Sequence, residues 1–439
     1  MTGISTSLPV KIELLKTLRR NKLLLTSFYI LIFLAIVALL APVIANEKPL
    51  YVSYKGFSLF PAFSFKNNVR IKSNAGEELL QYNLVDWKKL KCDKIIFAPV
   101  PYSPSKTDYA NADYVSPGGE QFLAGTNGEP EKMPARFKHR LGTDKLGRDV
   151  LSGLIYGTRI SIAVGIFSMA IASLIGIFLG AIAGYFGDYD LRISRGIFWM
   201  LIAGMIAGYF YAFELRGFKL RDALQTSTIA FLFQFLISIL VFIFITTVFY
   251  FAGKLLNTIS FFNKQVFIKA DSIVNRLIEI LSSLPLLILI ISIAAITRPS
   301  LINLVLIIGL ISWTDIARLT RAEFLKLRKM EFIEAARALG YSRKRIIFRH
   351  ALPNGIAPAL IAISFGIAGA ILVESSLSFL GIGVQPDAVT WGTLLAAGRE
   401  NFSAWWLVIF PGCAIFITVT VFNIFGEGLR DALDPKLRS

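Results

Sequence analysis

The side chains most able to bind a metal ion or attack a substrate are few in this chain. It has two histidines, His139 and His350, and two cysteines, Cys92 and Cys413. The histidines are far apart, and one cysteine lies in a polar region while the other lies in an apolar run, so no metal-ligand spacing exists and a disulfide is not expected. An enzyme needs converging acids, bases, nucleophiles or metal ligands. We therefore predict no catalytic residue, no metal site and no cofactor.

A second chemical candidate is the segment at residues 141–161, LGTDKLGRDVLSGLIYGTRIS. Its closely spaced glycines and aspartates could suggest phosphate or calcium binding. The segment has neither the spacing of a P-loop nor that of a calcium-binding loop. The whole chain also lacks the pattern G-x-x-x-x-G-K-[ST], so it does not bind ATP by that route.

One acid lies inside an apolar run. Glu374 is near the outer end of residues 355–380, in the stretch ILVESSLSFLG. A carboxylate within a membrane is costly unless it faces protein or water. Two interpretations are open: Glu374 lies on a translocation pathway, or it is a structural anchor that forms hydrogen bonds at a helix end.

Residues 331–353, EFIEAARALGYSRKRIIFRHALP, lie between two apolar runs and therefore form a soluble loop of a membrane protein. The first part has the spacing of a short helix, with Phe332, Ala336 and Leu339 on one face. Its acids, Glu334 among them, come early and its arginine comes late, which suits the helix dipole. We expect the three apolar residues to be the buried contact face of a docking element.

The same loop contains signals that end one helix and begin another. Gly340 ends the first helix, where a left-handed residue is needed. Ser342 can then cap a second, basic helix that runs until Pro353 blocks it. This helix–glycine–helix arrangement predicts a compact docking surface for another protein, and an ordinary cytoplasmic loop is the alternative.

Composition places these residues in a membrane protein. Of the 439 residues, 55% are hydrophobic and 17% are charged, and the mean hydropathy is +0.62. Soluble domains carry about 25% charged residues, so the deficit predicts a polytopic membrane protein. The net charge is +17, and the basic residues cluster beside apolar runs. This pattern favours the positive-inside rule and contact with anionic lipid or a partner subunit over nucleic-acid binding.

The apolar runs divide the chain into segments. Residues 1–22 form a basic cytoplasmic tail, residues 23–46 are long enough to be a first transmembrane helix, and residues 47–140 form an extracytoplasmic insertion of irregular or small α+β character. Further spans are expected at the following residues: 160–183, about 281–296, 301–317, 355–380 and 407–425. Basic residues between positions 318 and 329 place that side in the cytoplasm.

Three glycines recur at four-residue spacing at the end of the span over residues 160–183. They are Gly176, Gly180 and Gly184. One strip of that helix is therefore bare, and we predict that another helix packs closely against it. The alternative is a chance scatter, because glycine is common in membrane helices.

Residues 196–270 form a second insertion. It holds a short apolar run and a long one, at residues 196–213 and 226–253, with a basic linker between them. Two extra spans would keep the sidedness of the helices that follow. The linker would then face outside, against the positive-inside trend, and a re-entrant or interfacial arrangement is the alternative. We predict two extra helices and assign them no role.

Several of these stretches resemble one known family. Residues 141–161 resemble the pattern LGTDxxGRDVLSxLIYGxRxS of the second permease of dipeptide, oligopeptide and nickel ABC importers, and residues 331–353 resemble its EAA loop. ILVESSLSFLG and the ending GEGLRDALDP are also similar to family motifs. The motifs fall within residues 141–195 and 271–436. A short match at residues 46–63 resembles the microcin C-type subgroup of peptide permeases.

The resemblance implies that the loop is a coupling helix, which sits in a cleft of the ATP-hydrolysing subunit. Together with the helix face described above, it assigns coupling to these residues: Phe332, Glu334, Ala335, Ala336, Leu339, Gly340, Leu352 and Pro353. Among these, Glu334 and Gly340 are expected to fix the shape of the loop.

The resemblance also implies an architecture. The expected fold is an all-α integral membrane protein with a six-helix ABC importer permease core, two extra membrane helices and the extracytoplasmic insertion. The segments are then the tail, the first helix, the two insertions, residues 141–195 with the amphipathic segment and second core helix, and residues 271–436 with the rest of the core. The expected location is a bacterial inner membrane, crossed several times, with both termini in the cytoplasm.

The expected partners are a homologous second permease, two ABC ATPase subunits, an extracytoplasmic solute-binding protein and membrane lipid, without nucleic acid. The expected function is ATP-driven import of peptides, with ATP hydrolysis in the partner subunits. Uptake of nickel or of a peptide antibiotic is an alternative, and a membrane-embedded enzyme is a second one. The sequence does not name the solute.

Overall fold

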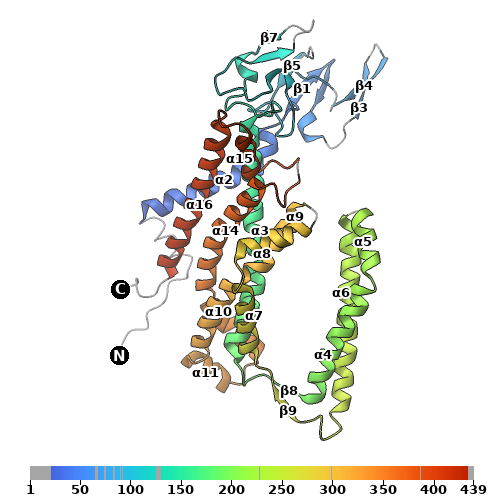
Figure 1. The fold of residues 1–439 in the computed structure, drawn as a ribbon, viewed down its shortest axis with the longest axis vertical. Coiled ribbons are helices and arrows are strands. Elements are labelled where there is room, and N and C mark those ends of the chain that lie inside the picture. The colour runs from blue at the N-terminus through green and yellow to red at the C-terminus, as the bar shows by residue number, and fades with distance from the viewer. Residues whose placement is uncertain are drawn as a thin grey trace.

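The computed structural model describes residues 21–64, 68–73, 76–82, 85–88, 90, 92–124, 130–226, 228–297, 299–385 and 387–433. Helices dominate, and the strands gather in residues 51–132 and in one ribbon near residues 192 and 267. Figure 1 shows a bundle of helices with the small strands above it and a separate helical hairpin at one side. Residues 1–20 of the predicted cytoplasmic tail lie outside the described residues.

The first described helix, α2, runs over Lys22–Ile44. Asn21 caps it, because its side-chain oxygen accepts hydrogen bonds from the amide nitrogens of Leu23 and Leu24 at 3.0 and 3.3 Å. The helix packs against α3 and α16. Most of its surface remains outside the protein core, as expected for a first membrane helix that faces lipid.

The insertion between α2 and α3 consists of short strands and single helical turns. Its strands are β1 Tyr51–Tyr54, β2 Phe57–Leu59, β3 Asn68–Ser73, β4 Gly76–Gln81, β5 Lys94–Ile96, β6 Phe122–Ala124 and β7 Pro130–Lys132, and its 3-10 turns are η1 Pro61–Phe63, η2 Tyr109–Asn111 and η3 Ala135–Phe137. One sheet has the order β2-β1-β5, and β3-β4 and β6-β7 are hairpins. A small aromatic core that includes Tyr54, Trp87 and Phe97 holds the first sheet.

The longest helix, α3, runs over Val150–Phe186. Its 37 residues make it about 55 Å long at 1.5 Å per residue. The Asp149 side chain caps its start by accepting a hydrogen bond from the amide of Ser152 at 2.7 Å. The helix therefore begins before the span that we predicted over residues 160–183, because Asp149 caps it upstream of the apolar run.

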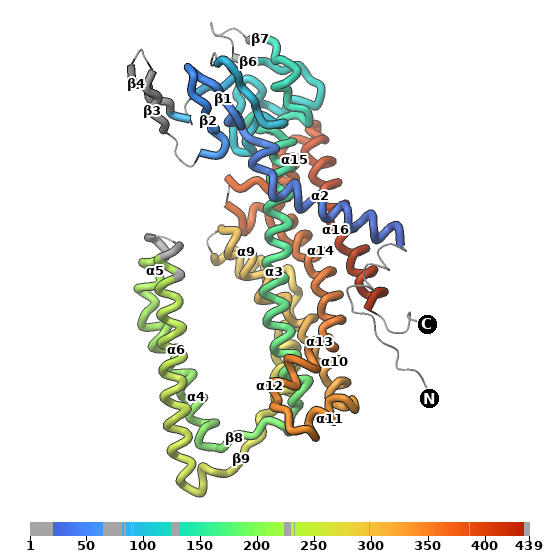
Figure 2. The backbone as a smooth tube through the Cα atoms, turned by 180° about the vertical axis from the view of Figure 1, so that it is seen from behind, coloured from blue at the N-terminus to red at the C-terminus, as the bar shows by residue number. Residues whose placement is uncertain are grey.

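Residues 192–267 form a unit of their own. The strands β8 Arg192–Ser194 and β9 Gln265–Phe267 pair antiparallel, and between them lie α4 Arg195–Tyr209, the π-helical turn η4 Phe210–Glu214, α5 Gly217–Thr226 and α6 Thr228–Leu256. Figures 1 and 2 show α4 and α6 as a hairpin that stands apart from the bundle, with α5 at its far end. The two predicted extra helices are present, and by length and composition the segments Arg195–Glu214 and Phe233–Leu256 could each cross a membrane.

The next helices bend sharply. The helix α7 covers Ala270–Ser282 and α8 covers Leu286–Ile296, and their axes differ by 80°. The span predicted over residues 281–296 contains this break, and the 11 residues of α8 alone reach only about 16 Å of the ~30 Å needed. Pro285 stands at the break and lacks the amide hydrogen that a continuous helix would need.

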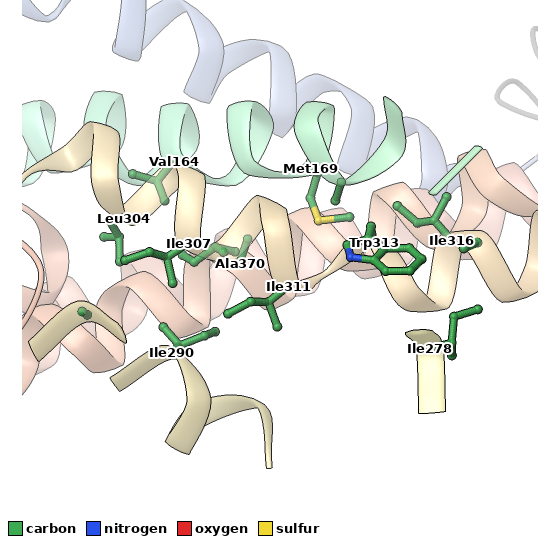
Figure 3. Packing of buried hydrophobic residues seen from close by; sticks show 14 of the residues in the cluster. Val164, Met169, Ile278, Ile290, Leu304, Ile307, Ile311, Trp313, Ile316 and Ala370 are labelled. Carbon is green, nitrogen blue, oxygen red and sulfur yellow. The ribbon is translucent and has the colours of Figure 1, made fainter. Parts of the chain in front are cut away.

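The remaining helices complete the bundle. They are α9 Leu301–Ile311, α10 Trp313–Leu327, α11 Glu331–Ala338, α12 Arg343–Arg345, the π-helical η5 Ile346–Ala351, α13 Leu352–Gly355, α14 Ala357–Phe379, α15 Trp391–Glu400 and α16 Trp406–Leu433. The main core lies between α3, α8, α9, α10 and α14. Figure 3 shows Met169 of α3 beside Trp313 of α10 in this core, with Ile307 and Ile311 of α9 below them.

Among the described residues, seven helices are long and apolar enough to cross a membrane, or up to eight if α7 and α8 count as one bent span. These helices, with strands confined to the insertion and to one ribbon, make the chain an all-α membrane protein. The predicted fold class is therefore confirmed.

Candidate functional site

The helix α11 is an amphipathic element that the chain anchors by one face. Ile333 is 0% exposed and Ala336 is 4% exposed. Both lie in a cluster with Phe324 of α10, Tyr185 of α3 and Ile346 of η5. The short helix is thus fixed to the ends of α3 and α10, because eight residues would be too few to form a stable helix alone.

The opposite face of α11 is open. Phe332 is 39% exposed and Leu339 is 71% exposed, and Glu334 and Ala335 are also exposed. The predicted grouping of Phe332, Ala336 and Leu339 on one buried face is therefore corrected, because Ala336 points into the protein while the other two point out. Ile333, which the sequence reasoning left out, is the residue that shares the buried face.

The turn after α11 has the expected shape. Gly340 has a φ of +75°, which is the left-handed conformation that favours glycine. The Ser342 hydroxyl accepts a hydrogen bond from the amide of Arg345 at 3.4 Å. The second helical stretch differs from the prediction: it continues from α12 through η5 into α13, with half-buried Leu352 and exposed Pro353 in its last turn. Pro353 is the second residue of α13 and does not end the stretch, because its missing amide hydrogen is not needed in the first turn after the π-helical η5.

A cavity of about 310 Å³ separates this loop from the end of α3. Arg337 lies over the Tyr185 ring, 5.3 Å from its centroid, and Arg343 donates a hydrogen bond to the backbone oxygen of Asp190 at 3.1 Å. These contacts tie the loop to the loop that follows α3. The sequence reasoning did not find them, because the partners are more than a hundred residues apart.

The three glycines of α3 lie against α10. A methyl group added at Gly176 would lie 2.8 Å from Ile316 Cβ, one at Gly180 would lie 2.6 Å from the backbone oxygen of Ala317, and one at Gly184 would lie 2.5 Å from the backbone oxygen of Arg321. Real Cβ atoms essentially never show such distances. The two helices therefore approach closely along this strip, and any larger residue would separate them.

Glu374 is fully buried in α14. Its Oε2 accepts a hydrogen bond from Ser161 of α3 at 2.8 Å and one from Ser375 at 3.3 Å, and its Oε1 accepts one from Ser378 at 2.8 Å. The carboxylate is thus enclosed by hydroxyl groups of α3 and α14 in this structure. Of the two interpretations of Glu374, the structure supports the anchor that joins α3 to α14 rather than a position on the pathway.

The aspartates of residues 141–161 are used within the protein. Asp144 Oδ1 accepts hydrogen bonds from the amides of Leu146 and Arg148, both at 2.9 Å, and its Oδ2 accepts one from the Arg148 Nε at 2.6 Å. Asp149 caps α3. The segment therefore shapes a turn and a helix start, which is consistent with the absence of phosphate and calcium spacing. Across the described residues, no group of three His, Cys, Asp or Glu side chains is placed to hold a metal ion.

A larger cavity, of about 660 Å³, lies where α7 bends into α8. It is lined by Met169, Leu281, Ser282, Leu284, Pro285, Leu286, Ile308, Ile311, Ser312, Thr314, Asp315, Ile316, Ala362, Phe365, Gly366, Gly369, Ala370 and Val373. Most of these side chains are apolar, and a few serine, threonine and aspartate groups lie among them. No pattern in the sequence predicts this site, because its lining residues come from several helices. Pro285, which stands at the break between α7 and α8, is the one local signal of the bend.

Comparison with known families gives two matches. Residues 260–439 match the binding-protein-dependent transport system inner membrane component, and residues 13–61 match the N-terminal transmembrane domain of oligopeptide transport permease C. The first match contains the bent helices, the anchored loop and all the cavity-lining residues except Met169. The second contains α2.

Individual relatives agree with these matches. The chain is 31% identical to the dipeptide transport system permease protein DppC of Alkalihalophilus pseudofirmus, over 72% of this chain and 78% of that protein. It is 31% identical to the di/tripeptide transport system permease protein DppC of Pseudomonas aeruginosa, over 78% of this chain and 84% of that protein. It is 28% identical to the peptidoglycan transport system permease protein YejE of Agrobacterium fabrum, over 93% of this chain and 89% of that protein.

These matches cover two thirds or more of the relatives, and they agree with a bundle of membrane helices around a cavity. This chain is thus a multi-pass inner-membrane protein. The chain belongs to the family of permease components of binding-protein-dependent peptide transporters of the ABC class.

Proposed function

We propose that this chain is one of two permease subunits that enclose a pathway for short peptides and related molecules, and that α11 receives the motion of a separate ATPase subunit. The observation that carries the coupling role is the division of α11 into two faces. Ile333 and Ala336 fix it to the helical bundle, while Phe332 and Leu339 remain open to a partner. Exposed apolar side chains on an anchored element are typical of a protein-binding site.

A continuous set of contacts leads from α11 to the cavity. The helix α11 is anchored on α10 and α3, which pack together along the glycine strip. The start of α10 forms one wall of the 660 Å³ cavity through Thr314, Asp315 and Ile316. A partner that binds α11 differently in two states would therefore shift α10, and with it the cavity, since coupling requires such a difference in binding.

The cargo class follows from the relatives and from the cavity. The relatives described above are named as permeases of dipeptide, di/tripeptide and peptidoglycan transport systems, and another is named as a glutathione transport permease. The cavity is mainly apolar with a few polar groups. The polar groups suit the peptide backbone, which is the same in every peptide, and the apolar walls suit varied side chains. We assign ATP hydrolysis to partner subunits and delivery of the peptide to a solute-binding protein.

Variants of the exposed face test the coupling role. Phe332→Ser and Leu339→Ser are expected to reduce peptide uptake strongly in the complete transporter while the complex still inserts, because each removes apolar contact from the partner but not from the core. Gly340→Val is expected to do the same by straining the turn, since its φ is +75°. Phe402→Ser serves as the control, because Phe402 is exposed in the loop before α16.

The measurements are uptake of a labelled dipeptide and ATP hydrolysis by the reconstituted complex. Normal uptake in the Phe332→Ser and Leu339→Ser variants would contradict the coupling role. Loss of uptake in the Phe402→Ser control as well would show that exposed phenylalanines matter for a reason other than docking to the ATPase.

A further inference from the structure

The large cavity contains one charged wall residue among the described residues that line it. Asp315 projects from the first turn of α10, and Arg318 follows it one turn later. The Arg318 Nη1 lies 3.3 Å from Asp315 Oδ1, and the Arg318 Nη2 donates a hydrogen bond to the Ser282 hydroxyl at 3.4 Å. The Asp315 carboxylate, the Arg318 guanidinium and the Ser282 hydroxyl thus meet at the edge of a mainly apolar cavity.

This ion pair is available to a ligand. The side chains of Asp315 and Arg318 are 78% and 54% exposed, so neither is held by the protein core. Exposed pairs between residues three apart on a helix contribute little stability, and a favourable interaction of Asp315 with the helix dipole does not require the arginine. A charged group of a ligand can therefore replace either member of this ion pair at little cost in free energy.

The chemistry of a short peptide complements this pair. At neutral pH a free peptide carries an ammonium group at one end and a carboxylate at the other. An aspartate accepts hydrogen bonds from ammonium, and a guanidinium binds carboxylate through two parallel hydrogen bonds. Residues three apart on a helix are separated by about 4.5 Å along the axis, and a dipeptide spans about 7 Å, so two flexible side chains can reach both ends.

We propose that Asp315 and Arg318 recognise the two charged ends of a short peptide in the pathway, Asp315 holding the amino group and Arg318 the carboxylate. The Ser282 hydroxyl keeps the guanidinium at the cavity mouth. The peptide side chains then contact the apolar walls, which include Leu284, Leu286 and Phe365. This inference rests on the proposed transport of peptides and assigns the residues that select zwitterionic cargo.

The test uses the complete transporter with its solute-binding protein in proteoliposomes. The probes are labelled alanyl-phenylalanine, its N-acetyl derivative and its C-terminal amide. Asp315→Asn is expected to reduce uptake of the free dipeptide about tenfold, the size of a lost charge-assisted hydrogen bond, without a further reduction for the N-acetyl probe. Arg318→Gln is expected to reduce uptake of the free dipeptide in the same way and to spare the amide probe.

A matched pair on another helix provides the control. Arg276 and Glu279 of α7 also lie three residues apart, exposed and 2.9 Å from each other, but they do not line the cavity. Glu279→Gln and Arg276→Gln are expected to leave the uptake of all three probes unchanged. ATP hydrolysis stimulated by the peptide-loaded binding protein reports whether each variant remains coupled.

The outcomes separate the two proposals. Uptake of the dipeptide by Asp315→Asn at the wild-type rate, or an equal loss for free and N-acetyl probes, overturns recognition by this pair. Loss of stimulated ATP hydrolysis in the variants shows structural damage and also overturns it. If the unmodified transporter takes up none of the probes, the proposed peptide transport itself fails.

Discussion

Among the described residues outside the membrane helices, His139 is a titratable side chain that is almost fully buried, at 1% exposed. Its Nδ1 lies 2.9 Å from Asp149 and its Nε2 lies 3.3 Å from Asp108, while the Tyr102 ring stacks on the imidazole at 4.0 Å between centroids. The Lys88 ammonium covers the other face of that tyrosine, 3.9 Å from the ring centroid. Because Asp149 also caps α3, His139 links the insertion between α2 and α3 to the start of the longest helix.

The environment of His139 raises its pKa above the usual 6.5. Burial by itself disfavours the charged ring, but the hydrogen bonds to Asp108 and Asp149 outweigh it. The pKa of Asp108 is lowered from 3.8, since its hydrogen bonds to His139 and Asn111 outweigh its burial. A histidine whose pKa is raised in the folded state contributes its full stabilisation below pH 6.5. This contribution is lost as the pH rises through the folded-state pKa of His139, whereas the contribution of Asp108 is lost as the pH falls below 3.8.

We therefore predict that the insertion is most stable between about pH 4 and pH 6.5, the unshifted values of the two groups, and that it weakens as the pH rises further. His139→Gln is expected to cost about 1–3 kcal/mol, because buried Asp149 and half-buried Asp108 lose their hydrogen bonds to the ring while Lys88 remains near both carboxylates, and to abolish that loss above neutral pH. Thermal unfolding of the purified protein across pH measures both effects. His350→Gln, which lies in the loop on the far side of the chain, should retain the pH profile; a His139→Gln profile identical to wild type would contradict this prediction.

At the scale of elements, the contact between α3 and α10 decides how the bundle closes. Gly180 lies so near Ala317 and Thr320 that an added methyl would be 2.6 Å and 2.8 Å from their atoms. The helices can pack this closely only because one of them has a bare strip. The coupling role that we propose for α11 depends on this contact, since α11 is anchored on the ends of the same two helices.

Gly180→Leu is predicted to destabilise the protein by about 1–3 kcal/mol, the usual cost of overpacking, and to lower peptide uptake because α10 is displaced. Gly412→Ala is the control, since nothing lies within 4 Å of a methyl added there and Gly412 does not line the cavity. The thermal midpoint of the purified complex and the uptake rate are the measurements. Equal midpoints for Gly180→Leu and Gly412→Ala would contradict the close packing.

At the scale of the whole molecule, the hairpin of α4 and α6 stands apart from the bundle and begins and ends at one ribbon (Figure 2). Ser194 and Gln265 are neighbours in that ribbon. The two ends are also held independently of the hairpin, because Asp188 accepts hydrogen bonds from the amide and hydroxyl of Ser272 at 2.9 and 2.6 Å.

Replacement of residues 195–264 by Asn-Gly is therefore predicted to leave the bundle folded, because a two-residue turn of this type closes antiparallel strands. The shortened chain is expected to insert, to co-purify with its partner subunits and to keep its thermal midpoint. An Asn-Gly chain that fails to insert would show that α4 and α6 are needed for assembly of the core. Deletion of residues 301–327, which removes α9 and α10 from the core, is the disruptive control.

The orientation of the chain can be read with thiol reagents. Both native cysteines are free, Cys92 in the insertion and Cys413 in α16. We predict that a membrane-impermeant maleimide labels Cys92 from outside and labels Lys344→Cys, in the coupling loop, only from inside. Burial raises the pKa of the Cys92 thiol and nearby Asp93 adds to the effect, so labelling is expected to be slow at neutral pH and faster at alkaline pH. Labelling of Cys92 from inside and of Lys344→Cys from outside would contradict this topology. Loss of the label in Cys92→Ser would show that the reagent reacts with Cys92.

The sequence by itself determined the features that depend on neighbouring residues. The apolar runs predicted the membrane helices, including α4 and α6, since length and composition suffice to define a span. The turn at Gly340 and the cap at Ser342 were also predictable, because each depends on a backbone conformation or a hydrogen bond within a few residues. The resemblance of residues 331–353 to the EAA loop predicted that α11 is a docking element.

Only the tertiary structure decided which groups meet. The helix period of α11 could not show that Ile333 and Ala336 face inward, because that choice depends on the ends of α3 and α10. Glu374 obtains a hydroxyl partner from Ser161, which is 213 residues away. The cavity beside Asp315 exists because α7 and α8 bend by 80° and α10 passes the bend, and no local pattern encodes the distance between elements that meet only when the chain has folded.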